Sequence, residues 1–201
     1  SRGFIGTGSA TSSDIPFFEF VINEPSSVTW LWGTPDTMFN SPEWSVPAEI
    51  AKYAGSGIAS LKRMPDGSPI IAYYSTADNS IKVGWYRSGQ WTIHKVYTIT
   101  SKADDVIAYE GNNLCLAVDS RGVPHVAFYN PAVGVVMSVF TGATWTPATI
   151  DSIDDPGRFL SFEIGPGNIP HFAYYSAKNG DLVHTRLENN VLHRTVVDEV
   201  G

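Results

Sequence analysis

An internal repeat limits what this chain can fold into more than any other feature of its sequence. Three segments share a turn rich in Gly, Asp or Asn, then a proline, then a run of apolar and aromatic residues. They are residues 69–74 (PIIAYY), 124–129 (PHVAFY) and 170–175 (PHFAYY). Self-similarity at a regular spacing is typical of folds that stack copies of one supersecondary unit.

Each copy continues downstream in the same way. An apolar residue twelve positions after the proline opens a further strand, and a last strand begins near a tryptophan or its equivalent. The strand-opening residues are Ile81, Val136 and Leu182, and the last strands begin at Trp91, Trp145 and Leu192. The strand before each proline, at residues 58–64, 113–119 and 159–164, completes four strands per copy.

A weaker copy comes first in the chain. Pro16 takes the place of the repeat proline, a strand over residues 3–8 precedes it, and Val28 opens the next strand. We expect its last strand to start near Trp44, after an insertion of about six residues. Residues 47–53 suit a helix or a strand equally, and we expect no other helix.

Four copies about fifty residues apart, each with four short strands, predict a β-propeller. The fold class is therefore all-β, with four four-stranded antiparallel blades in a single domain over residues 1–201. The blades are expected at residues 1–54, 55–103, 104–152 and 153–201.

Small residues occur nine positions before each repeat proline: Thr7, Ser60, Cys115 and Ser161. The first strand of a blade lies where the blades converge, and small side chains suit that crowded position. Cys115 is therefore interpreted as a packing residue. It is also the only cysteine, so no internal disulfide can form.

Composition excludes several function classes. The net charge is −7, and the Lys and Arg residues are scattered, which argues against nucleic-acid binding. No apolar run is long enough to span a membrane. We find no ligand set that predicts a metal or another cofactor.

The turn-Gly-x-Pro-His-hydrophobic-Ala-Tyr-Tyr pattern, followed by a strand that begins with Trp, resembles the degenerate blade repeats of bacterial secreted and surface propellers. These are broadly similar to sialidase-like and lectin-like propellers. The resemblance covers residues 57–201 well and the first 55 loosely. It implies a fold more than an activity, because propellers carry many unrelated functions.

Two histidines and a row of aromatic residues are the main ligand-binding candidates. His125 and His171 occupy one repeat position and could line a shared cleft, although Ile70 at that position favours packing. Trp32, Trp85 and Phe140 share a register in the third strand, with Arg186 in the last copy. Flat rings stack on sugars, and the alternative is packing between blades.

A loop and two acidic pairs are further candidates for a functional role. The loop 34–42 interrupts the repeat and carries Met38 and Phe39, which predicts either an interaction loop or a neutral insertion. Acidic pairs at 104–105 and 154–155 could serve a glycosidase, but solvated loop positions explain them better.

We expect a non-enzymatic recognition or adhesion module, lectin-like, located outside the cell or on its surface. Its expected partners are a glycan or a protein, and it is expected to bind neither nucleic acid nor the membrane interior. The alternative is a structural subunit of a larger extracellular or virion assembly, and the expected partners then include further copies of the chain in a homo-oligomer or the components of that assembly. A glycoside hydrolase ranks third.

Overall fold

The computed structural model describes residues 2–3, 17–23, 27–33, 48–52, 54–100 and 113–199. In these residues the chain is all-β, with sixteen strands in four-stranded antiparallel sheets and one short 3-10 turn, Pro166–Asn168. The chain divides into two compact units, Ser1–Ser56 and Gly57–Gly201. No helix in the described part of the chain is long and apolar enough to cross a membrane.

The first unit holds one sheet, whose strands follow chain order: β1 (Arg2–Gly3), β2 (Phe17–Asn23), β3 (Ser27–Gly33) and β4 (Ala48–Lys52). The described part of the strand paired with β3 runs from Ala48, which lies opposite Trp30. The predicted strand start near Trp44 and the predicted strand over residues 4–8 lie outside the described residues.

The second unit holds three sheets, which confirms the strands predicted there. The second sheet contains β5 (Ala54–Arg63), β6 (Pro69–Ser75), β7 (Ser80–Arg87) and β8 (Gln90–Thr98). The third contains β9 (Leu114–Val118), β10 (Pro124–Asn130), β11 (Gly134–Phe140) and β12 (Trp145–Asp151). The fourth contains β13 (Pro156–Ile164), β14 (Pro170–Ser176), β15 (Asp181–Glu188) and β16 (Val191–Asp198).

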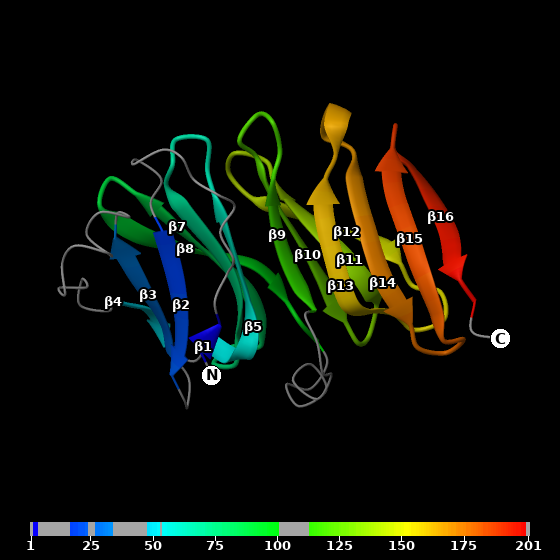
Figure 1. Ribbon diagram of the computed structural model, residues 1–201, viewed down its shortest axis with the longest axis horizontal. Coiled ribbons are helices and arrows are strands. Elements are labelled where there is room, and N and C mark those ends of the chain that lie inside the picture. Colours follow the sequence, from blue (N-terminus) through cyan, green and yellow to red (C-terminus); the bar gives the residue numbers. More distant parts are fainter. Residues whose placement is uncertain are drawn as a thin grey trace. The chain divides into compact units, whose positions relative to one another are not determined.

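The third sheet packs on the second sheet with one face and on the fourth with the other (Figure 1). Side chains alternate along β10, since successive residues of a strand point to opposite faces. Val126 and Phe128 enter the core shared with the second sheet, and Ala127 enters the core shared with the fourth. All seven residues of β10 are therefore buried.

The small residues before the repeat prolines lie at these sheet contacts. The hydroxyl oxygen of Ser60 accepts the backbone N–H of Leu116 at 3.0 Å, which joins the second sheet to the third. The thiol of Cys115 donates to the carbonyl of Leu160 at 3.2 Å, which joins the third sheet to the fourth. Cys115 is buried, in keeping with the predicted packing role.

The predicted register of the aromatic row is wrong by one residue in two sheets. Trp85 pairs with Ile70 and Arg186 pairs with His171, but Val139, not Phe140, pairs with His125. The cause is turn length: residues 76–79 and 177–180 make four-residue turns, whereas residues 131–133 make a three-residue turn. A shift of one residue moves a side chain to the other face of its sheet.

In the first sheet the predicted register is also wrong by one residue, but in the opposite direction. Trp32 pairs with Phe18, the second residue after the proline, rather than with Phe17. Trp32 therefore occupies the register of Gly84, which pairs with Ile71 in the second sheet.

A glycine is required at the start of β11. Gly134 has a φ of +107°, and a Cβ there would collide with the carbonyl oxygen of Asp151. Asp151, at the end of β12, lies at the contact with the fourth sheet. Its carboxylate accepts the hydroxyl of Tyr174 and the Nε–H of Arg194 at 2.8 Å.

We predict that Asp151→Ala lowers the free energy of unfolding by about 3 kcal/mol, because it removes the acceptor of a buried hydroxyl and of a partly buried guanidinium. Lys95→Gln, which removes an exposed ion pair to Asp78, is the matched control and should change stability by less than about 0.5 kcal/mol. Urea unfolding measures both. Equal stability of the two variants would contradict the role of Asp151.

Candidate functional site

A pocket of about 550 Å³ lies where the second and third sheets meet, and it opens to solvent. Three segments form it: the end of β7, the turn between β9 and β10, and the end of β11. The lining residues are Trp85, Arg87, Arg121, Gly122, Val123, Pro124, Val139, Phe140, Thr141 and Gly142. Aromatic and aliphatic walls with a few convergent polar groups are typical of small-molecule sites.

An arginine stacked on a tryptophan forms one wall. The guanidinium carbon of Arg87 lies 3.6 Å from the centroid of the Trp85 ring, a cation–π contact. Trp85 meets Phe140 edge to face, with their ring centroids 5.5 Å apart. Trp85 is only 4% exposed, so it supports the pocket while the guanidinium of Arg87 faces the solvent.

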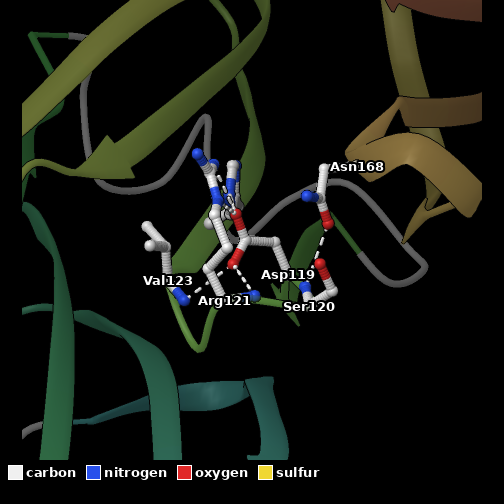
Figure 2. A network of polar contacts seen from close by, with 6 residues as sticks. Asp119, Ser120, Arg121, Val123 and Asn168 are labelled. Carbon is white, nitrogen blue, oxygen red and sulfur yellow. Dashed lines mark hydrogen bonds and ion pairs between the residues drawn. The ribbon is translucent and has the colours of Figure 1, made fainter.

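The opposite wall is a turn held by Asp119 (Figure 2). Its Oδ1 accepts the backbone N–H groups of Arg121 and Val123, each at 2.9 Å. Its Oδ2 accepts Nε–H and Nη2–H of Arg121 at 3.0 and 2.7 Å. The turn is therefore fixed, and Arg121 lines the pocket.

The third sheet's turn is also tied to the fourth sheet. Figure 2 shows the backbone N–H of Ser120 donating to the side-chain oxygen of Asn168, at 3.0 Å. Asn168 belongs to the equivalent turn of the fourth sheet. The turn that forms this wall of the pocket is therefore held both by Asp119 and by a hydrogen bond to the fourth sheet.

The charge of the pocket is set by its two arginines. None of the described residues that line it is Asp or Glu. Burial would raise the pKa of Asp119, but hydrogen bonds from Val123 and Arg121 outweigh it and hold that pKa below its ordinary value. Asp119 therefore stays ionised and orients Arg121, while the charge of Arg87 is exposed to solvent.

His125 does not line this pocket. It lies in β10, 6% exposed, with its Nε2 3.7 Å from Oδ2 of Asp119. Both ring nitrogens are buried without a hydrogen-bond partner in the described part of the chain. Burial lowers the pKa of His125, against the attraction of Asp119, so the neutral ring is favoured.

His171 and Arg186 are neighbours in the fourth sheet, paired across β14 and β15. The ring nitrogens Nδ1 of His171 and Nε2 of His184 share a hydrogen bond of 3.1 Å, and the two rings stack. Burial and the nearby His171 lower the pKa of His184. His125 faces the contact between the third and fourth sheets, whereas His171 alternates with the buried Phe172, so the two predicted histidines share no cleft.

The remaining predicted residues fall elsewhere. Trp32 lies in β3 of the first unit, opposite Phe18. Met38 and Phe39 lie outside the described residues. Asp154 forms an ion pair with Lys178, and Asp155 forms one with Arg158, so both carboxylates stabilise the loop before β13. In the described ranges, no three His, Cys, Asp or Glu residues gather in a way that could hold a metal ion.

Trp85 could be identified from the sequence, but Arg87 and the role of Arg121 could not be identified from the repeat pattern alone. Arg87 follows Trp85 by two residues, so both side chains emerge on one face of β7. The two-residue spacing from Trp85 was the sequence feature that could have placed Arg87 beside it. Arg121 comes from the next copy of the repeat, and only the packing of the two sheets brings it to the same pocket.

No protein-family model matches the sequence, and no curated protein matches it either. Solved structures do resemble it. A lectin of Aleuria aurantia in complex with Fucα1-6GlcNAc superposes with a TM-score of 0.62 at 14% identity, over 90% of this chain and 56% of the lectin. The lectin SapL1 in complex with alpha methyl fucoside has a TM-score of 0.60 at 11% identity, over 90% of this chain and 60% of the lectin.

A Hadza microbial sialidase resembles the chain less closely, with a TM-score of 0.53 at 13% identity, over 87% of this chain and 37% of the sialidase. At these identities the likeness shows the fold, which is that of β-propeller lectins and sialidases. The chain spans little more than half the length of the two lectins.

We predict that His125→Ile makes stability less dependent on pH. Below pH 6.5 the unfolded chain binds a proton that buried His125 resists, so its contribution to stability is lost as pH falls. Isoleucine occupies this register in the second sheet, as Ile70. Urea unfolding between pH 5 and pH 7.5 should give a flatter profile for the variant.

The control is His193→Gln, at an exposed histidine of β16. It should keep the pH profile of the parent protein. If His125→Ile leaves the dependence of stability on pH unchanged, folding does not lower the pKa of His125 and the prediction is wrong.

Proposed function

We propose that this protein is a non-enzymatic carbohydrate-recognition module of β-propeller architecture, which acts outside the cell or on its surface. In this proposal all four sheets are blades of a propeller, including the first. The observation that carries it is the pocket between the second and third sheets, where Trp85, Arg87 and Arg121 converge.

The chemistry of the pocket suits a sugar. The partly exposed side chains of Phe140 and Val123 offer apolar surface to one face of a pyranose ring, while Trp85, buried beneath Arg87, supports the pocket from below. The planar guanidinium groups of Arg87 and Arg121 offer several N–H donors to ring hydroxyls or to an acidic substituent. Arg121 is held ready by Asp119, so little ordering is needed on binding.

The fold supports the same class of ligand. Two similar structures are lectins in complex with fucosides, and fucosides are therefore the first probes. A usual glycoside hydrolase places two carboxyl groups around the scissile bond. The absence of Asp and Glu from the described lining of this pocket favours recognition over hydrolysis.

We predict that the folded protein binds a sugar from a panel of fucosides and acidic monosaccharides and that Arg87→Ala weakens this binding about 10-fold or more, because it removes a charge-assisted donor. Arg87 is exposed, so the variant should fold normally. Isothermal titration calorimetry measures the affinity. Arg63→Ala, at an exposed arginine outside the pocket, is the matched control and should bind as the parent does.

Two results would contradict the proposal. One is a folded parent protein that binds no member of the panel or of a glycan array. The other is an equal loss of affinity in both arginine variants, which would indicate general attraction to positive charge rather than a site.

A further inference from the structure

The pocket between the second and third sheets is rich in hydrogen-bond donors and poor in acceptors. Its two arginines, Arg87 and Arg121, end in guanidinium groups, which donate hydrogen bonds and accept none. Thr141 has the only side chain in the described lining that can accept a hydrogen bond, and its hydroxyl is engaged with Thr144. A ligand of this pocket must therefore supply most of the acceptors itself.

Asp119, the carboxylate behind Arg121, does not supply the missing acceptor. Its side chain is 0% exposed, and it accepts two backbone N–H groups and two N–H groups of Arg121 (Figure 2). These bonds occupy the lone-pair sites of the carboxylate. Asp119 thus balances the charge of Arg121 and has no acceptor left for a sugar hydroxyl.

Arg87, by contrast, carries a charge that no acid in the described part of the chain cancels. No Asp or Glu there forms an ion pair with it. The pKa of Asp66 is lowered chiefly by hydrogen bonds from Ser68, and the attraction of Arg87 is a lesser cause. The pocket is therefore positively charged, although the whole chain has a net charge of −7.

Stacking on Trp85 holds Arg87 in a conformation suited to an anion. Its guanidinium carbon lies 3.6 Å from the centroid of the ring, and Trp85 is itself fixed by burial. A guanidinium that lies over a ring keeps its edge, where the N–H groups are, free for a ligand. Two parallel N–H groups of such an edge match two oxygens of a carboxylate or a sulfate.

We propose that this pocket selects sugars that carry an anionic substituent, a carboxylate or a sulfate, over neutral sugars. The inference rests on the carbohydrate-recognition function proposed above and narrows its class of ligand. An anionic group accepts hydrogen bonds without donating any, so it satisfies Arg87 and needs no acceptor from the protein. Each hydroxyl of a neutral sugar also donates, and a donor that leaves water without finding an acceptor weakens binding.

This selectivity differs from that of the similar structures. Two of them are lectins in complex with fucosides, which are neutral sugars. The apolar surface of Phe140 and Val123 serves neutral and acidic rings alike, so the substituent that reaches Arg87 decides between them.

The experiment is isothermal titration calorimetry of the parent protein with two matched pairs, glucose with glucuronic acid and galactose with galacturonic acid. In at least one pair the acid should bind about 10-fold or more tightly than its neutral partner, because it adds a charge-assisted hydrogen bond. Glucuronamide, which has the shape of glucuronic acid without its charge, should bind as weakly as glucose. Glucose 6-sulfate distinguishes the two anions, and methyl fucoside is the neutral probe taken from the similar lectins.

Arg87→Gln should remove the preference, so that an acid and its neutral partner bind within about 2-fold of each other. Arg87→Lys keeps the charge but not the planar pair of donors, and it should retain only part of the preference. Arg87 is exposed, so both variants should keep the circular dichroism and thermal midpoint of the parent. Arg63→Gln, at an exposed arginine outside the pocket, is the matched control and should keep the full preference.

The results that would overturn the inference differ in what they leave standing. Neutral sugars, methyl fucoside included, that bind as tightly as the acids would disprove the selectivity and leave carbohydrate recognition intact. A preference for acids that survives Arg87→Gln, or that Arg63→Gln removes equally, would show that the preference does not come from this pocket. A folded parent protein that binds no sugar of either kind would overturn the recognition function and the inference together.

Discussion

Burial of both faces of a sheet is the constraint on which the rest of this structure depends. The central strand of the third sheet, β10, is apolar on both sides and buried along its whole length. A sheet of this kind cannot stand alone, because one of its faces would be left in water. A neighbouring sheet in the stack covers that face. The hydrogen bonds of Ser60 and Cys115 recur at equivalent positions because each pair of neighbouring sheets packs in the same way.

The pocket follows from this stacking. The strands must keep their shape in order to pack, so the copies differ most in the turns at the sheet ends. One turn position holds Met64 in the second sheet, Asp119 in the third and Gly165 in the fourth, and each donates and accepts the same backbone bonds. Only Asp119 can also fix an arginine, and only the junction of the second and third sheets places Trp85 beside it.

The strands of the second unit could be predicted from sequence because their signals are local: a glycine turn, a proline, and alternating apolar residues. The residues that share the pocket could not, because Arg121 and Trp85 come from different copies and meet only through packing. Phe140 was placed on the wrong face because its register depends on the length of an earlier turn, which a fixed count from Pro124 ignores. In the first copy the sequence signal was weakest, because its proline is followed by an insertion that breaks the spacing of the later copies.

The three-residue turn at 131–133 has a consequence for how such a repeat can diversify. This turn is one residue shorter than its equivalents, and β10 keeps its place. Every side chain of β11 therefore lies on the face opposite to the one that a fixed count from the proline predicts, and Phe140 contacts Trp85 across the junction of the two sheets. A change of one residue in the length of this turn thus exchanges the two faces of β11 while β10 beside it keeps its packing. Copies that began alike can in this way bring different side chains to the same junction between sheets.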